Sequence, residues 1–438
     1  MSKSFYRQKW QSLQQGPCRP EELSRLARQI AFSFLDTYLK DYRYEQEYIT
    51  LLCEMTTYFQ DPQLNIPGSQ ALFGIIIESL CDDFEELQTI TYNKVMSQVI
   101  SYCRGIAAGK SLDQKLSDFG ITCTEDLIQR IERIRGEEKY LQSHKKVSKI
   151  IVLSRVTIGA DVAITSIILQ RMKSVFPQAE IVLIAKDKAE QIYAGHDSLT
   201  LRYVAYTRNG DLLERLSSWH EVLDIIEDEL RETPREETIL IDPDSRLSQL
   251  GVLPLVPEDK YYFFDSRSDK VFMNKYSMPE LANAWLDQLL GEKEFYYPRV
   301  WLSKEDLGQA DNICSRLYQN GAQRIAVVNF GYGGNPRKRV GASFEVQLVL
   351  ELLKEPHTVV ILDRGFGVEE AANSEFLLQE IKKQGYPYAQ GSFAEFPAAS
   401  NMSWGVLAMQ CQLGEIASLI ACSSEFIGYD SACQHMAA

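Results

Sequence analysis

The residues with the clearest chemical potential lie near the C-terminus, where Asp430, Ser431 and His435 follow an apolar run at 425–429. The run predicts a short buried strand, and the next residues predict a helix that places His435 on the same side as Ser431. Open α/β sheets bind ligands at the carboxyl ends of their strands, and helix N-termini favour anions. A phosphorylated ligand would suit this arrangement, although Asp430 or Ser431 could simply cap the helix.

A second candidate site lies in a glycine-rich loop at 329–341 that also carries three consecutive cations. Gly333 and Gly334 would let backbone N–H groups approach an anion, and Lys338 and Arg339 would counter its charge. Arginine offers a two-pronged contact and lysine a point charge. The chain as a whole has a net charge of −14. Three adjacent cations in so acidic a chain favour a phosphate site over a merely solvated basic loop, which is the alternative.

The elements that must position these residues begin near Ser148, where strand and helix patterns start to alternate. Strands are predicted at 149–153, 181–185, 199–206, 238–241, 261–265, 324–330, 358–362 and 425–429. Helices are predicted at 161–176, 211–230, 277–290, 303–320, 343–354 and 368–383. This alternation predicts mainly parallel sheets with right-handed crossovers. The stretch 291–300 would connect two α/β domains, 149–290 and 300–438.

Residues 1–145 predict helices without a convincing strand. Leu23, Leu26, Ile30 and Phe34 share one helical face, and Ser69 is a candidate cap for a further apolar helix. We therefore expect an all-helical accessory domain before the α/β region.

Two segments together resemble a known family. The strand at 149–153 is followed by Gly159 and Asp161, and the next helix ends near Phe176-Pro177. With the late Asp-Ser-Ala-x-x-His-x-Ala-Ala stretch at 430–438, this order resembles glycosyltransferase family 9, the heptosyltransferase-like group. Ala160 is inserted between glycine and aspartate, and Ala432 stands where glycine is usual. The resemblance covers about residues 149–438. It implies an α/β, GT-B-like fold in which two Rossmann-like domains face each other, the second apparently truncated.

The resemblance assigns a catalytic role to Asp161. In the family, the aspartate after the glycine deprotonates the acceptor hydroxyl, as an inverting sugar transfer requires. The carboxylate would stand at the carboxyl end of the first strand, beside the cleft. Capping of the helix that starts at Val162 would explain Asp161 equally well.

The resemblance also assigns the donor side. Lys338 matches a family lysine that precedes a Trp-Pro pair, here replaced by Val340-Gly341. A family glutamate near Glu369 contacts the nucleoside, and we favour Glu369 slightly over Glu370. Acids in a first helical turn also suit the helix dipole without any ligand. Together with Asp430, Ser431 and His435, these residues would bind a nucleotide-activated sugar.

The acceptor side is less well marked. Arg246 and Arg267 follow the predicted strands 238–241 and 261–265, so they would lie at the ligand-binding edge, although ordinary turns would explain both segments. The nearby Asp242-Pro243-Asp244 triplet is interpreted as a turn. We expect no metal and no cofactor, because enzymes with this fold generally work without a metal.

Composition limits the possible partners and location. The acidic balance argues against a nucleic-acid-binding protein, which needs a basic surface. No signal peptide and no membrane-spanning run is evident, so we expect a cytoplasmic protein with at most peripheral membrane contact. Nine cysteines lack C-x-x-C spacing, which predicts neither a zinc site nor a disulfide framework.

The leading hypothesis is thus an inverting glycosyltransferase that acts on a bacterial glycan or glycolipid. A non-catalytic nucleotide-sugar-binding or interaction protein derived from such a transferase is the alternative. A Rossmann oxidoreductase would need G-x-G-x-x-G after its first strand, but 154–161 holds one glycine.

Overall fold

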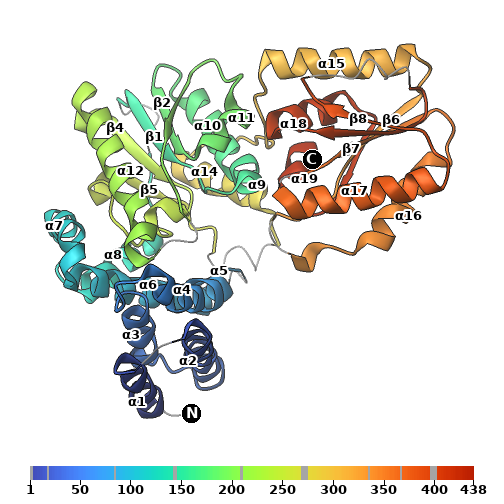
Figure 1. Cartoon of the computed structure of the whole chain (residues 1–438). Coiled ribbons are helices and arrows are strands. Elements are labelled where there is room, and N and C mark those ends of the chain that lie inside the picture. The colour runs from blue at the N-terminus through green and yellow to red at the C-terminus, as the bar shows by residue number, and fades with distance from the viewer. Residues whose placement is uncertain are drawn as a thin grey trace. The chain divides into compact units, whose positions relative to one another are not determined.

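The computed structural model describes residues 3–16, 19–82, 85–141, 146–207, 211–267, 275–333, 336–365, 367–394 and 402–438. The chain forms two compact units (Figure 1). The first comprises Met1–Val156, Ile168–Lys186 and Thr200–Tyr296; the second comprises Thr157–Ile167, Asp187–Leu199 and Tyr297–Ala438. Each unit holds one five-stranded sheet, in which strands such as β1 and β2 of the first and β6 and β7 of the second pair in parallel. The predicted α/β class with two Rossmann-like sheets is confirmed.

Among the described residues before Lys149, all regular secondary structure is helical. The helices are α1 (Lys3–Gln14), α2 (Pro20–Asp41), α3 (Gln46–Met55), α4 (Pro62–Ala71), the π-helix η1 (Leu72–Ile77), α5 (Glu78–Asp82), α6 (Glu86–Gly105), the short 3₁₀ helix η2 (Ala107–Gly109), α7 (Lys110–Asp118) and α8 (Thr124–Gly136). The prediction that Ser69 caps a helix is wrong. Asp61 caps α4 by accepting a hydrogen bond from Gln63 N at 3.0 Å, and Ser69 lies buried inside that helix.

The continuous helix Pro62–Cys81 corrects the expectation that no segment could span a membrane. It is long and apolar enough to do so, and 56% of its most apolar window is buried inside the protein. Leu72, Ile76 and Leu80 belong to the core of the first unit. Such burial is what a core helix shows, so the apolar composition has a structural explanation.

The first sheet has the strand order β3-β2-β1-β4-β5. Its strands are β1 (Lys149–Leu153), β2 (Glu180–Ala185), β3 (Leu199–Tyr203), β4 (Thr238–Asp242) and β5 (Tyr261–Phe263), and the helices of this unit include α10 (Ser166–Val175), α12 (Leu212–Glu232) and α14 (Met278–Leu290). Every residue of β1 and β4 is buried, as expected for central parallel strands covered on both faces. The apolar runs at 150–153 and 239–241 explain why these two strands could be predicted from the sequence.

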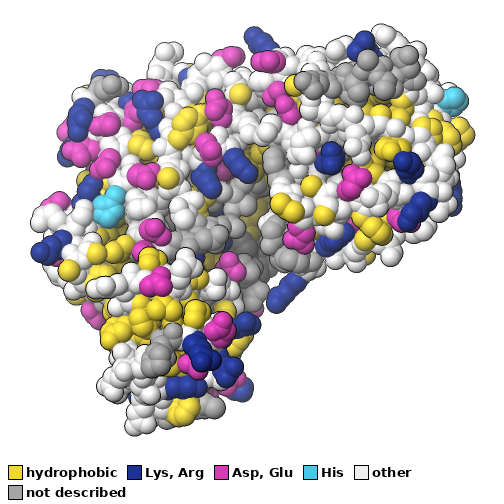
Figure 2. All heavy atoms as spheres, viewed as in Figure 1, with side chains coloured by type: hydrophobic (Ala, Val, Ile, Leu, Met, Phe, Trp, Pro, Cys, Tyr) yellow, Lys and Arg dark blue, Asp and Glu magenta, His cyan; other side chains and the backbone are white. Residues whose placement is uncertain are grey.

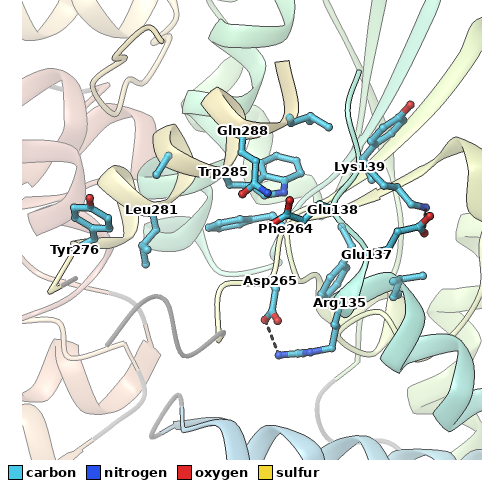
Figure 3. A pocket seen from close by; sticks show the side chains of 16 residues that line it. Arg135, Glu137, Glu138, Lys139, Phe264, Asp265, Tyr276, Leu281, Trp285 and Gln288 are labelled. Atoms are coloured by element: carbon cyan, nitrogen blue, oxygen red, sulfur yellow. Dashed lines mark hydrogen bonds and ion pairs between the residues drawn. The ribbon is translucent and has the colours of Figure 1, made fainter. Parts of the chain in front are cut away.

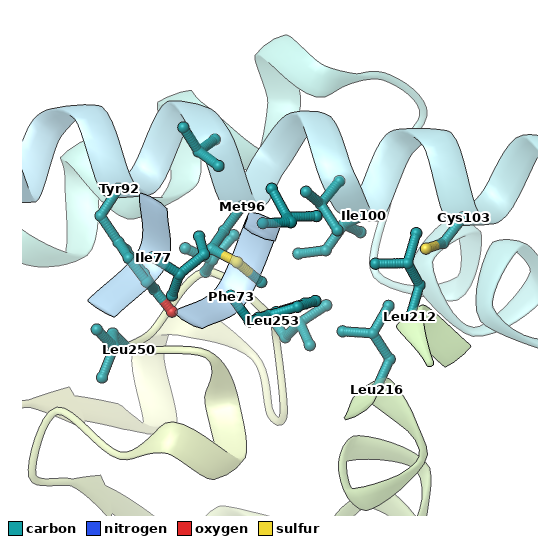
Figure 4. Close-up of a cluster of buried hydrophobic side chains, with 14 of the residues drawn as sticks. Phe73, Ile77, Tyr92, Met96, Ile100, Cys103, Leu212, Leu216, Leu250 and Leu253 are labelled. Atoms are coloured by element: carbon teal, nitrogen blue, oxygen red, sulfur yellow. The ribbon is translucent and has the colours of Figure 1, made fainter. Parts of the chain in front are cut away.

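The helical segment and the first sheet share one hydrophobic core. Buried side chains of η1 and α6, such as Phe73 and Met96, belong to the same cluster as Leu216 of α12 and Leu253 after β4 (Figure 4). The same cluster continues into β1 and β5. The N-terminal helices are therefore built onto the first α/β layer rather than linked to it by a surface loop.

This shared core predicts cooperative unfolding. Leu216→Ala should lower the free energy of unfolding by about 2–5 kcal/mol, the usual cost of truncating a buried leucine. Because the core is continuous, the helices and the sheet of the first unit should unfold in a single transition. Denaturant titration followed by circular dichroism and by tryptophan fluorescence checks this, and two separate transitions within that unit would contradict it.

The second sheet has the strand order β10-β6-β7-β9-β8. Its unit contains α15 (Lys304–Gln319), β6 (Arg324–Asn329), α16 (Ala342–Leu353), β7 (Thr358–Asp363), α17 (Gly367–Lys383), β8 (Tyr388–Ser392), β9 (Gly405–Gln410), α18 (Leu413–Cys422), β10 (Glu425–Gly428) and α19 (Ala432–Ala437). The sequence did not predict β8 or β9. The short apolar run of β9 fits a helix or a strand equally well, and β8 is half-exposed and lacks a continuous apolar stretch.

Two segments that follow strands of the first sheet group with the second unit. They contain α9 (Ile158–Ala160) with the π-helix η3 (Asp161–Thr165), and α11 (Glu190–Tyr193). Trp301 fixes the second of them, since its carbonyl accepts from Gly195 N at 2.8 Å and its N–H donates to Ile192 O at 2.7 Å. The side chain of Gln191 accepts from Leu413 N at 2.7 Å, at the start of α18.

Candidate functional site

The candidate donor site is built at the carboxyl ends of β6 and β7. Asn329 and Asp363 are register partners in these strands, and Asn329 Nδ2 donates to Asp363 Oδ2 at 2.6 Å. The loop amides complete the network, because Gly331 N donates to Asn329 Oδ1 at 2.9 Å and Gly365 N to Asp363 Oδ1 at 3.2 Å. The two strand-end loops are therefore held in a fixed relation to each other.

A cavity of about 440 Å³ opens above this network, entirely within the second unit. Three of the predicted donor residues, Gly333, Glu369 and Ser431, lie in its wall. Apolar side chains, among them Val368, Leu413 and Ile416, supply another part of the wall. The remaining lining residues are Asn329, Gly331, Tyr332, Asp363, Gly367, Glu370, Ala432 and Cys433. Gly334 lies outside the described residues.

Lys338, Asp430 and His435 form a charged cluster of this unit. Lys338 Nζ donates to Asp430 Oδ2 at 2.7 Å and to the Asp430 carbonyl at 3.0 Å. His435 Nε2 lies 3.7 Å from the other carboxylate oxygen of Asp430. The hydrogen bond from Lys338, with the nearby imidazole, lowers the pKa of Asp430. All three side chains are substantially exposed, at 39%, 66% and 44%, so a ligand can reach them.

Arg339 is engaged in a structural ion pair. Its Nε and Nη2 each donate to the Glu345 carboxylate at 2.8 Å, and Glu345 is 2% exposed. The Tyr429 hydroxyl donates to the same carboxylate at 2.9 Å. Tyr429 precedes Asp430, so this cluster ties the basic loop to the segment after β10. The guanidinium lines a small neighbouring cavity with Glu370 and is not in the wall of the 440 Å³ pocket.

Ser431 stands at the N-cap position of α19 but does not cap it. Its side chain makes no capping hydrogen bond, and its Oγ is buried without a hydrogen-bond partner. A buried hydroxyl without a partner is costly, and Ser431 lies in the pocket wall. Cys433, next but one in the chain, is buried, and this burial, with Asp363 and Glu370 nearby, raises the pKa of its thiol to about 12.

The two candidate glutamates differ in their surroundings. Glu369 is exposed, and its hydrogen bond with the Tyr332 hydroxyl raises the pKa of Tyr332. Glu370 lies over the strand-end glycines: a Cβ on Gly365 would come within 2.4 Å of Glu370 Oε2, and one on Gly331 within 3.4 Å of Oε1. Glycine at 365, which has φ +72°, therefore makes room for that carboxylate. Both glutamates line the pocket, so Glu370 is a candidate ligand contact alongside Glu369.

Asp161 is 1% exposed and begins the π-helix η3. Its Oδ1 accepts from Thr165 Oγ1 at 2.8 Å, and its carbonyl accepts from the Tyr193 hydroxyl at 3.0 Å. A π-turn takes in one more residue than an α-turn, and such turns are frequent at functional sites. Gly159 packs against the ring of His435, because a Cβ there would lie 2.4 Å from His435 Cδ2.

The two predicted acceptor arginines lie in the first unit. Arg267 is 4% exposed and pairs with Asp244, whose carboxylate also accepts from Ser266 Oγ at 2.6 Å and lies 3.7 Å from Arg155 Nη2. Burial would raise the pKa of Asp244, but Arg267 and Arg155 hold it below its ordinary value. Arg246 is half-buried and lies near the side chains of Tyr92 and Tyr206. Each of the two arginines therefore interacts with other side chains of the first unit.

No family model matches the sequence, and no curated protein matches it. Solved structures do. The chain is similar in fold to bacterial glycosyltransferases. A family 9 glycosyl transferase from Veillonella parvula aligns over 67% of this chain and 78% of its own, with 14% identity and a TM-score of 0.47. The E. coli ADP-heptose lipopolysaccharide heptosyltransferase II aligns over 66% and 81%, with 14% identity and a TM-score of 0.42.

A third structure, the E. coli heptosyltransferase WaaC with ADP, aligns over 66% of this chain and 83% of its own, with 12% identity and a TM-score of 0.41. At such identities the likeness concerns the fold.

Sequence reasoning missed Asp363, the buried hub of the pocket floor. Its position at the carboxyl end of a strand, directly before Arg364-Gly365, was the available signal. Strand register decides its importance, since it pairs Asp363 with Asn329. Register is a tertiary property that one sequence does not display.

The pocket floor predicts a pH-dependent affinity. Burial, partly offset by hydrogen bonds from Gly365 and Asn329, raises the pKa of Asp363 to about 6. Between pH 7.5 and 5.5 this carboxylate gains a proton and loses its repulsion toward an anion. The diphosphate of a nucleotide-sugar does not titrate in this range. Such a ligand should therefore bind roughly 3- to 10-fold more tightly at pH 5.5 than at pH 7.5, which corresponds to a shift of about one unit or less in the pKa of Asp363 on binding.

Titration calorimetry at both pH values measures this effect. Asp363→Asn should flatten the dependence, whereas His435→Gln separates any contribution of the histidine. An unchanged pH dependence in Asp363→Asn would contradict the assignment.

Proposed function

We propose that this protein is an inverting glycosyltransferase of the cytoplasm. It would transfer a sugar from a nucleotide-activated donor to a bacterial glycan or glycolipid, with no further cofactor. The observation that carries the proposal is the 440 Å³ pocket, in which Gly333, Glu369 and Ser431 converge from the ends of three neighbouring segments. Lys338 lies beside it through its ion pair with Asp430.

The pocket has the parts that a nucleoside diphosphate requires. Carboxylates at 369 and 370 suit ribose hydroxyls, and the apolar wall of Val368, Leu413 and Ile416 suits a base. The Ser431 hydroxyl has an unused hydrogen bond to offer a phosphate oxygen. Lys338 would exchange Asp430 for the diphosphate, because a phosphate is the more highly charged partner.

In the proposed reaction, Asp161 removes the proton of an acceptor hydroxyl as its oxygen attacks the anomeric carbon of the donor sugar. The new glycosidic bond forms while the bond between that carbon and the phosphate oxygen breaks. The electron pair leaves with the nucleoside diphosphate, whose charge Lys338 stabilises. The buried surroundings of Asp161 and its hydrogen bond from Thr165 would hold the carboxylate in one orientation.

Thermal denaturation with a panel of ADP-, GDP-, UDP- and dTDP-sugars in buffer containing EDTA tests the proposal. A donor at 100 times its Kd should stabilise the protein by about 2.7 kcal/mol, which raises Tm by several degrees. The same donor should then be consumed when a suitable acceptor is added. Stabilisation by NAD alone, with no response to any nucleotide-sugar, would contradict the proposal.

A second candidate function is a non-catalytic nucleotide-sugar-binding protein. Two observations favour it. The predicted acceptor contacts Arg246 and Arg267 interact with other side chains of the first unit, and Arg339 is paired with Glu345. Such a protein would bind the donor with one-to-one stoichiometry but would neither transfer nor hydrolyse its sugar across an acceptor panel.

A further inference from the structure

The carboxyl edge of the first sheet is largely filled by protein. Leu250 and Leu253, in the loop after β4, belong to the core that includes η1 and α6 (Figure 4). Arg130 of α8 donates to the Gly251 carbonyl at 2.5 Å, which fixes the same loop to the helical segment. In open α/β sheets this edge is where ligands bind. Here Ser245 after β4 donates through its hydroxyl to the carbonyl of Ser154 after β1, and both residues are buried.

An opening at the same edge remains beside β5. A cavity of about 280 Å³ lies between the end of α8, the end of β5 and one face of α14, all in the first unit (Figure 3). Trp285 and Gln288 come from α14, Phe264 follows β5, and Arg135 and Glu138 come from α8 and the residues after it. The helical segment thus contributes directly to the lining.

The lining combines a broad aromatic surface with separate polar groups. The rings of Trp285 and Phe264 lie 5.3 Å apart at an angle of 46°, and Tyr276 adds a partly exposed phenol. In Figure 3 the Gln288 amide lies near Trp285, while Asp265 and Arg135 form an ion pair of 2.6 Å on another side. The second amino group of Arg135, Nη1, is buried without a hydrogen-bond partner.

This combination matches the chemistry of a sugar ring. The C–H bonds of one ring face pack on an indole, while the hydroxyls at the rim bond to amide, carboxylate and guanidinium groups. The cations and anions of the lining are mixed, and Lys139 is already bound to the carbonyls of Glu258 and Tyr261 at 2.5 and 3.2 Å. A neutral ligand therefore fits better than a phosphate.

We propose that the cavity formed by α8, β5 and α14 binds a neutral sugar residue of the glycan acceptor, stacked on Trp285. That this sugar belongs to an acceptor rests on the proposed transferase function. Binding of the sugar itself does not require turnover. It also gives the N-terminal helical segment a role: through Arg135 and Glu138 it forms one wall of the sugar site.

Saturation-transfer NMR on the whole chain tests this with the methyl glycosides of glucose, galactose and N-acetylglucosamine as probes. At least one should receive saturation at its ring C–H protons. Trp285→Leu, which keeps an apolar side chain on α14 but removes the aromatic face, should weaken that binding at least tenfold. Trp404→Leu, a tryptophan exchange in the second unit, should leave it unchanged, and melting curves verify that both variants fold.

The outcomes also separate this inference from the proposed function. Lys338→Ala should leave methyl glycoside binding intact, because Lys338 belongs to the other unit. Nucleotide-sugar binding without any methyl glycoside signal, or a signal that survives Trp285→Leu, would overturn the sugar site alone. Methyl glycoside binding without nucleotide-sugar binding would overturn the proposed function alone.

Discussion

Replacing Asp161 by asparagine should lower kcat by roughly 10²–10⁴-fold, while the Kd of the donor stays nearly unchanged. Asparagine has the same shape but cannot take up the acceptor proton at neutral pH. The hydrogen bond from Thr165 Oγ1 at 2.8 Å can still form to the amide oxygen, so the π-helix should persist. Steady-state kinetics with the identified donor, together with donor titration, measures both quantities.

Thr165→Val is the matched control for this substitution. It removes the hydroxyl that orients Asp161 without removing the base, so kcat should fall much less than in Asp161→Asn. An asparagine variant with near-normal turnover would contradict the assignment. A parallel loss of donor affinity and kcat would instead indicate that Asp161 has a structural role.

Replacing Lys338 by alanine should weaken nucleoside diphosphate binding by roughly 10- to 150-fold. A charge-assisted hydrogen bond contributes about 1.5–3 kcal/mol, which corresponds to that range of Kd. The loss also leaves the Asp430 carboxylate, now 2.7 Å from Lys338 Nζ, without its cation near the phosphate site. Isothermal titration of both proteins with ADP, GDP, UDP and dTDP is the measurement.

Arg337→Ala controls for the general loss of positive charge. Arg337 is exposed and neighbours Lys338 on the same short turn, Pro336–Lys338, but the Asp430 contacts come from Lys338. Its removal should change Kd by no more than about threefold, as expected for a screened surface charge. Equal effects of the two substitutions would show that Lys338 makes no specific contact.

The fold could be predicted well where local pattern and burial agree. The strands predicted at 149–153 and 358–362 contain uninterrupted apolar runs at 150–153 and 359–362, and both are central buried strands. Prediction failed where the local pattern is ambiguous. β8 is half-exposed, and Ser69 has the type of a helix cap but lies inside a helix that Asp61 begins.

The site could be predicted from sequence only in part, for a related reason. Residue type and strand position brought Gly333, Glu369 and Ser431 to one pocket, because parallel strands end at a common edge. The engagement of Arg339 depends on Glu345, six residues further along in α16, and on Tyr429, which follows β10. The surroundings of Arg246 depend on helices that lie far earlier in the sequence. Such side-chain pairings arise from tertiary packing and leave no local signal.

The most direct test of the central claim is a crystal structure of the chain soaked with the nucleoside diphosphate that binds best in titration. The account predicts density in the 440 Å³ pocket, with ribose hydroxyls at Glu369 or Glu370 and the diphosphate within hydrogen-bond distance of Ser431 Oγ and Lys338 Nζ. Lys338 should have released Asp430. A nucleotide bound elsewhere, with the pocket unchanged and the ion pair between Lys338 and Asp430 intact, would contradict it.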